Sequence, residues 1–203
     1  MTLFIFAALM GYLLGSLNLA CFFSKAKGFD IRTHGSHNAG ASNAAITMGW
    51  KFGVAVAVHD VAKTLAAALL AGLLFPALSA APAIAAAAAV LGHIFPFYLE
   101  FHGGKGFAPF LGLTLALDWR FFLGILLVVL LITLITDYLV LGTFTTIISF
   151  PIHLFFIRTG IVVVAIVGIV SLVIFCKHFV NIKRLATGQE IGLRRTIHQK
   201  DRI

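Results

Sequence analysis

The chain has 203 residues, of which 61% are hydrophobic and only 11% charged, and its mean hydropathy is +1.06. Soluble domains are about 45–50% apolar and about 25% charged, so this composition excludes an ordinary soluble domain and indicates a bilayer as the solvent. The formal net charge is +8, but the basic residues stand in short segments between apolar runs. This spacing favours orientation across a membrane over nucleic-acid binding, so we expect membrane lipids, and no nucleic acid, as partners.

Seven apolar stretches predict an all-α integral membrane protein with seven transmembrane helices in a single domain, residues 1–203. They lie at roughly residues 3–24, 53–75, 82–99, 106–117, 120–136, 138–156 and 161–179. A helix needs about 20 mostly apolar residues to cross a bilayer, so the fourth stretch is short and is expected to be tilted or partly re-entrant. The first stretch lacks the basic run of a secretory signal, and we expect it to be retained as a helix.

The distribution of Lys and Arg orients these helices. With the C-terminus in the cytoplasm, only Arg120 and Arg158 fall outside. The basic residues that fall inside are Lys25, Lys27, Arg32, Lys51, Lys105, Lys177, Lys183, Arg184, Arg194, Arg195, Lys200 and Arg202. Because cytoplasmic loops are enriched in Lys and Arg, we predict an external N-terminus and a cytoplasmic C-terminus. Residues 25–51, residues 99–106 and the segment after 176 then share the inner side.

Several other kinds of site find no support in the sequence. Cys21 and Cys176 lie near the ends of predicted helices without the spacing of metal ligands, so we predict no disulfide, no metal and no cofactor. No His is followed five positions later by Asp, and neither GxSxG nor HExxH occurs. Serine hydrolases, zinc proteases and acyltransferases of the His-x4-Asp type are therefore not indicated.

The first segment suited to an anion is residues 35–43, Gly-Ser-His-Asn-Ala-Gly-Ala-Ser-Asn. Its glycines let the backbone approach an anion, and Ser36, Asn38 and Asn43 supply side-chain donors. An ordinary polar turn at the membrane surface explains the same residues about equally well, so the segment alone does not decide between the two.

The second segment is His102-Gly103-Gly104-Lys105-Gly106, immediately before an apolar helix. Successive backbone N–H groups at a helix start, together with a Lys side chain, make a cradle for phosphate. The nucleotide-binding pattern GxxxxGK[ST] after a strand is absent, which argues against an ATPase. The alternative is a flexible basic loop that contacts lipid headgroups.

The third segment is His178-x-x-Asn181, at the end of the last predicted helix. Spacing of three residues puts the imidazole and the amide on one helical face, where both can meet a substrate hydroxyl or phosphate. Lys183 and Arg184 follow directly, and a basic helix end that contacts anionic lipid is the more ordinary interpretation of the residues alone.

The fourth constellation lies inside the second apolar stretch, where Asp60 and Lys63 are three residues apart with His59 beside them. Charges in hydrocarbon are costly, so we expect these two residues to pair and to point into the bundle. A structural ion pair and a functional one remain equally open. A small ion-coupled transporter built on this pair is the alternative function.

Taken in order, these segments resemble the bacterial acyl-phosphate:glycerol-3-phosphate acyltransferase family, known as PlsY. The matching elements are Gly15-Ser16, residues 35–43, Asp60-x-x-Lys63, Gly92-His93-x-Phe95-Pro96, Gly103-Gly104-Lys105-Gly106 and His178-x-x-Asn181-Ile182-x-Arg184-Leu185 ending in Gly188-x-Glu190. The set runs across nearly the whole chain. Its order is specific, whereas Gly-Gly-Lys-Gly alone is weak evidence.

The resemblance implies an enzyme of the bacterial inner membrane with its active site on the cytoplasmic side. It would transfer a fatty acyl group from acyl phosphate to the 1-hydroxyl of glycerol 3-phosphate, giving lysophosphatidic acid for phospholipid biosynthesis. Substrate phosphate would be bound by Ser36, Asn38, Asn43, Gly103, Gly104, Lys105 and Gly106. His178 and Asn181 would be the catalytic pair. Asp60, Lys63 and His93 would be structural residues or residues whose role the resemblance leaves open.

Five positions depart from the pattern usual in that family. They are Ile46 for Arg, His102 for Lys, Pro109 for Thr, Asp137 for Arg and Val140 for Ser. The changes surround the expected acceptor pocket, and loss of a bidentate phosphate contact costs on the order of 1.5–3 kcal/mol. A divergent paralogue that uses a different acceptor is therefore a close alternative.

Overall fold

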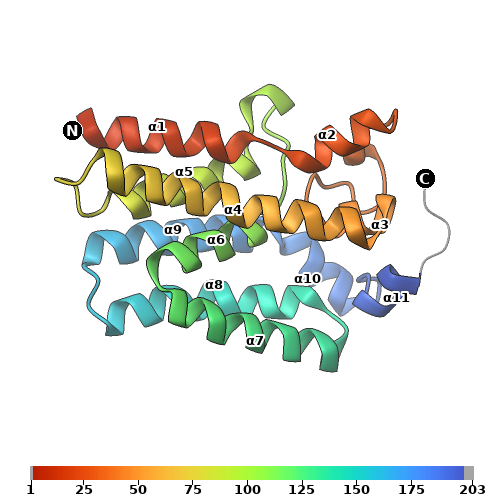
Figure 1. The fold of residues 1–203 in the computed structure, drawn as a ribbon. Coiled ribbons are helices and arrows are strands. Elements are labelled where there is room, and N and C mark those ends of the chain that lie inside the picture. Colours follow the sequence, from red (N-terminus) through yellow and green to blue (C-terminus); the bar gives the residue numbers. More distant parts are fainter. Residues whose placement is uncertain (1, 199–203) are drawn as a thin grey trace.

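The computed structural model describes residues 2–198, and every regular element in that range is a helix (Figure 1). The α-helices are α1 (Thr2–Ser16), α2 (Leu19–Ala26), α3 (Ala41–Met48), α4 (Trp50–Leu74), α5 (Ala81–Ile94), α6 (Phe107–Leu117), α7 (Trp119–Thr136), α8 (Leu139–Phe156), α9 (Ile161–Lys177), α10 (Phe179–Ala186) and α11 (Leu193–His198). Two short 3₁₀ helices, η1 (Ile31–Thr33) and η2 (Phe97–Leu99), lie in the connections. Lys200 and Arg202, which we assign to the inner side, are outside the described residues.

The predicted apolar helices all form, but their number of membrane crossings is not fixed by the fold. Within residues 2–198, five helical stretches are long and apolar enough to cross a bilayer, and the count rises to six if α9 and α10, which meet at a 46° bend, make one span. Helix α6 has eleven residues, or about 16 Å at 1.5 Å per residue. That is about half of a hydrocarbon core, so seven crossings remain a prediction.

Helices α1 and α5 pack with their backbones in close contact. A Cβ atom added at Gly11 would collide with the carbonyl of Ala85, and one at Gly15 would collide with that of Ala89. Small residues allow such approach in membrane proteins, where dispersion contacts drive helix association. The larger core lies between α5, α6, α8 and α9, where the rings of Phe110 and Phe150 meet edge to face at 6.0 Å.

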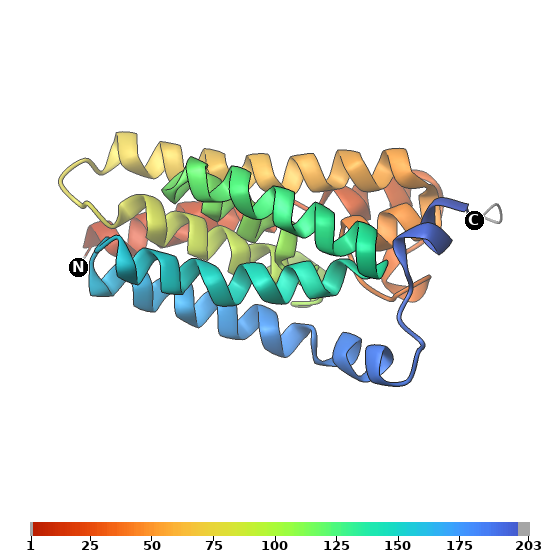
Figure 2. The same cartoon turned by 90° about the horizontal axis from the view of Figure 1, so that it is seen from below.

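The elements that carry the candidate site residues gather toward one end of the bundle. In Figures 1 and 2, α2, α3, α10 and α11 stand at the end opposite the N-terminus. The connection between α5 and α6 turns back part-way along the bundle (Figure 1), because α5 and α6 are both short.

Candidate active site

Asn43 organises the loop that precedes α3. It is fully buried, its Nδ2 donates to the carbonyls of Ile31, His34 and Asn38 at 2.8–2.9 Å, and its Oδ1 accepts the N–H of Ser36 at 2.7 Å. With its amide fully occupied, Asn43 shapes the loop, and the direct phosphate contact predicted from the sequence stays a prediction.

The turn that precedes Asn43 carries two candidate donor side chains, Ser36 and Asn38. Gly35 has φ +61° and faces the side-chain amide oxygen Oδ1 of Asn43 so closely that a Cβ atom would collide with it. The side chains of Ser36 and Asn38 have no hydrogen-bond partner among the described residues. Of these two, Asn38 lines the cavity described below and Ser36 does not.

The glycine loop before α6 differs from the predicted cradle. The N–H of Gly103 donates to the carbonyl of Ile94, and that of Gly104 to the carbonyl of His93, both at 3.1 Å. These two N–H groups satisfy the last carbonyls of α5, and phosphate binding through them stays a prediction. The N–H groups of Lys105 and Gly106, just before α6, have no acceptor among the described residues.

At each glycine of this loop, the surroundings or the backbone conformation disfavour a side chain. A Cβ atom at Gly104 would overlap the imidazole of His93, and one at Gly103 would overlap the His93 carbonyl. Gly106 has φ +93°, a conformation that side chains disfavour, and it is the N-cap of α6. The loop therefore lies directly on the end of α5, and the donors left for a ligand are at its last two residues.

Lys105 joins this loop to the C-terminal segment. Its Nζ donates to Oδ1 of Asn181 at 2.5 Å, and Nδ2 of Asn181 donates to Oε1 of Glu190 at 2.6 Å. Burial lowers the pKa of Lys105, and the Glu190 carboxylate opposes this by raising it. The other oxygen of Glu190, Oε2, is buried and has no partner among residues 2–198. The sequence motif contains Glu190, but nothing in it reveals this link to Asn181.

His178 occupies the bend between α9 and α10. It is 6% exposed, and its Nδ1 lies 2.8 Å from the carbonyl of Ile174. A carbonyl only accepts, so Nδ1 carries the proton and Nε2 keeps its lone pair. His178 is the N-cap of α10 and Asn181 lies in the first turn of that helix, so the predicted common face falls at the 46° bend between α9 and α10. Neither residue is among those that line the cavity.

A buried ion pair supports the glycine loop from beneath. Nζ of Lys63 lies 2.7 Å from Oδ1 of Asp60, donates to the carbonyl of Leu17 at 2.7 Å, and lies 3.0 Å from Nδ1 of His93. The predicted pairing of Asp60 and Lys63 is confirmed. The pair links the break between α1 and α2 to His93, on which Gly104 rests, so its position indicates a structural role.

Replacing Lys63 with Met is expected to lower the free energy of unfolding by about 3–5 kcal/mol, because Asp60 would become an unpaired buried charge. The thermal unfolding midpoint of the purified protein in detergent measures the change. The double variant Asp60→Leu/Lys63→Met removes both charges and should be more stable than the single variant. A single variant as stable as the wild type would contradict this role of the pair.

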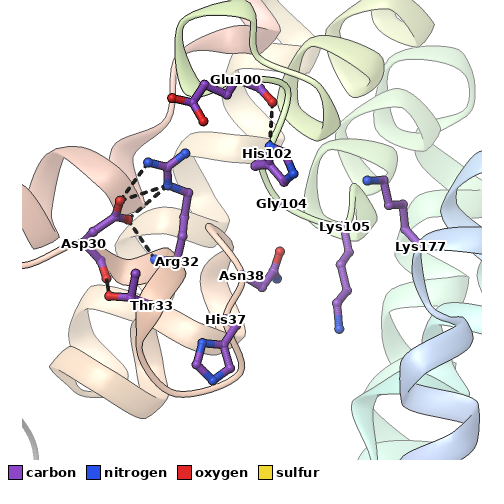
Figure 3. Close-up of a pocket in the computed structure, with 11 residues that line it drawn as sticks. Asp30, Arg32, Thr33, His37, Asn38, Glu100, His102, Gly104, Lys105 and Lys177 are labelled. Atoms are coloured by element: carbon purple, nitrogen blue, oxygen red, sulfur yellow. Dashed lines mark hydrogen bonds and ion pairs between the residues drawn. The ribbon is translucent and has the colours of Figure 1, made fainter.

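The loop segments enclose an open cavity of about 440 Å³ (Figure 3). It is lined by Asp30, Arg32, Thr33, His37, Asn38, Glu100, His102, Gly103, Gly104, Lys105 and Lys177. Two contacts hold its walls together: the N–H of Ala39 donates to the carbonyl of Gly103 at 3.4 Å, and Nη1 of Arg32 to that of Leu99 at 3.0 Å. The three predicted inner segments therefore meet around one pocket.

The departing positions have ordinary structural surroundings. Ile46 is half-buried beneath the Gly35 turn, Val140 is buried in α8, and Pro109 is buried in the first turn of α6, where a missing N–H costs no helical bond. Asp137 binds α11: its carbonyl accepts the N–H of Leu193 at 2.9 Å, and its Oδ1 accepts the N–H of Arg194 at 2.8 Å.

An all-helical, multi-pass membrane protein with a Lys-bearing pocket suited to phosphate is the class that this fold and site define. A family model described as glycerol-3-phosphate acyltransferase matches residues 5–188. The chain belongs to this glycerol-3-phosphate acyltransferase family.

Individual relatives agree with this assignment over nearly the full length. The chain is 36% identical over 198 residues to glycerol-3-phosphate acyltransferase 1 of Oceanobacillus iheyensis, covering 94% of this chain and 95% of the relative. It is 36% identical over 186 residues to glycerol-3-phosphate acyltransferase of Aquifex aeolicus, covering 92% and 97%.

Solved structures show the same fold. The glycerol 3-phosphate form of PlsY, an integral membrane glycerol 3-phosphate acyltransferase, superimposes with a TM-score of 0.88 at 35% identity, covering 97% of this chain and 99% of that one. The lysophosphatidic acid form of PlsY gives a TM-score of 0.84 at 34% identity, with the same coverage. The predicted resemblance to the PlsY family is confirmed.

Proposed function

We propose that this protein transfers a fatty acyl group from acyl phosphate to the 1-hydroxyl of glycerol 3-phosphate, giving lysophosphatidic acid and inorganic phosphate. The observation that carries the proposal is the pocket that Lys105 and Asn38 line together, in a chain that belongs to the glycerol-3-phosphate acyltransferase family. Solved structures of its relative PlsY include a glycerol 3-phosphate form and a lysophosphatidic acid form, which supports the same acceptor and product for this protein.

The chemistry requires little more than alignment of the two substrates. The hydroxyl oxygen of the acceptor attacks the acyl carbonyl carbon, the bond from that carbon to the phosphate oxygen breaks, and inorganic phosphate leaves. The acyl group is already activated, so the barrier falls mainly through positioning and through neutralising two anions that repel each other. Lys105 supplies positive charge, and the Nε2 lone pair of His178 can take the hydroxyl proton.

The proposal includes the membrane topology. Seven crossings, with α6 as a short or re-entrant one, an external N-terminus and a cytoplasmic C-terminus put the pocket on the cytoplasmic side of the inner membrane. The Lys and Arg distribution supports this orientation. A transporter is not needed to explain the charges inside α4, because Asp60 and Lys63 neutralise each other and hold backbone and imidazole groups.

A different acceptor is the second candidate, favoured by the aliphatic Ile46 under the Gly35 turn, which brings no charge. The decisive assay uses purified protein in lipid vesicles with acyl phosphate and glycerol 3-phosphate, and measures lysophosphatidic acid and released phosphate. Acyl coenzyme A and acyl carrier protein serve as competing donors, and glycerol and dihydroxyacetone phosphate as competing acceptors. No product from acyl phosphate with any of these acceptors would refute the proposed donor.

A further inference from the structure

The proposed reaction brings two phosphate-bearing substrates into one pocket, so its walls need more than one cation. Lys105 faces Asn181 and the Glu190 carboxylate. The guanidinium of Arg32 is held by the Asp30 carboxylate, with nitrogen–oxygen distances of 2.7–3.1 Å, so its charge is largely compensated.

Lys177 lines the same cavity from the opposite wall, at the last residue of α9. Its Nζ lies 4.5 Å from the ring centroid of Phe95, and within residues 2–198 no carboxylate lies within ion-pair distance of it. Figure 3 shows its amino group turned toward the loop that carries Gly104. An aromatic ring holds an ammonium group in place without cancelling its charge, unlike a carboxylate.

We propose that Lys177 is a second phosphate-binding residue of this pocket and helps to set the affinity for one of the two substrates. The inference rests on the proposed function. It also accounts for the source of positive charge in the pocket, because Ile46 under the Gly35 turn is aliphatic and brings no charge. The cation stands on the α9 wall instead, held over Phe95 and directed at the end of the glycine loop.

Lys177→Gln is expected to raise the KM for either acyl phosphate or glycerol 3-phosphate by about tenfold, because the substrate phosphate loses one charge-assisted contact that solvent exposure partly weakens. The two KM values are measured separately in vesicles, and the one that rises identifies the phosphate group bound. The kcat should change by less than about threefold, and Lys177→Arg, which keeps the charge, should keep most of the affinity.

Lys183→Gln is the matched control. Lys183 also lies over an aromatic ring, with Nζ 5.1 Å from the centroid of Phe179, but it is not part of the cavity wall. If Lys183→Gln raises the same KM as much, the effect is one of general surface charge and the proposal is wrong. It is equally wrong if Lys177→Gln leaves both KM values unchanged.

A binding measurement separates this inference from the proposed reaction, because it needs no turnover. Inorganic phosphate should raise the thermal unfolding midpoint of the wild type and of Lys183→Gln, and should raise it clearly less for Lys177→Gln. Equal shifts in all three proteins would overturn the role of Lys177. If phosphate behaves as expected while acyl phosphate gives no product, the proposed reaction fails and the site stands.

Discussion

Lys105→Ala is expected to lower kcat/KM for acyl transfer by about 100-fold or more, the largest effect of any single change in the pocket. The variant loses a charge-assisted contact to substrate phosphate, worth about 1.5–3 kcal/mol, and also the donor that fixes Asn181. Initial rates of lysophosphatidic acid formation, with each substrate varied in turn, measure the change.

The control for this prediction is Lys51→Ala, at an exposed position in the first turn of α4 outside the cavity. It should keep activity close to that of the wild type. Unfolding midpoints of both variants show whether the folded state survives. If Lys105→Ala is folded and still keeps more than about a fifth of the wild-type kcat/KM, Lys105 contributes less than one charge-assisted contact and its assigned role is wrong.

Gly104→Ala is expected to lower kcat/KM by about 10- to 100-fold, because overpacking of a close contact costs about 1–3 kcal/mol. The new methyl group would overlap the His93 ring, which the contact with Lys63 keeps from moving aside. The loop must therefore lift away from α5, and this displaces Lys105, which lines the cavity. Steady-state kinetics in vesicles should show the loss mainly as weaker substrate binding.

Gly168→Ala is the matched control, since Gly168 lies inside α9 and a Cβ atom there meets nothing within 4 Å. It should leave activity unchanged and raise the free energy of unfolding slightly, because Ala is favoured over Gly inside a helix by about 1 kcal/mol or less. Full activity in Gly104→Ala would mean that the loop can shift without consequence, and its position on His93 would then not matter for substrate binding.

Apolar length was enough to locate the long helices, but the short ones around the pocket depend on contacts distant in sequence. The first apolar stretch contains a break after Ser16, where Asn18 caps α2 by accepting the N–H of Cys21 at 2.9 Å. Helix α3 follows a loop that Asn43 holds by four hydrogen bonds. No hydropathy pattern records such side-chain to backbone bonds, so hydropathy describes residues 25–51 only as a polar segment.

The sequence predicted which residues belong to the candidate site better than it predicted what each of them contacts. Motif order identified Lys105, His178 and Asn181, and Lys105 and Asn181 are hydrogen-bonded to each other. The use of the Gly103 and Gly104 N–H groups was not predictable, because it depends on where the last carbonyls of α5 point. Lys177 resembles any basic residue at a membrane helix end until its place in the cavity wall is known.

The contact between Asp137 and α11 limits which C-terminal tails from related chains could dock on this protein. Its carboxylate accepts the N–H of Arg194, and Gly192 lies so close that a methyl group there would collide with it. A chain with Arg at this position lacks the carboxylate that accepts the N–H of Arg194. Residues 137 and 192–194 should therefore change together in evolution, and a chimera that swaps the tail alone should lose the docking of its last helix.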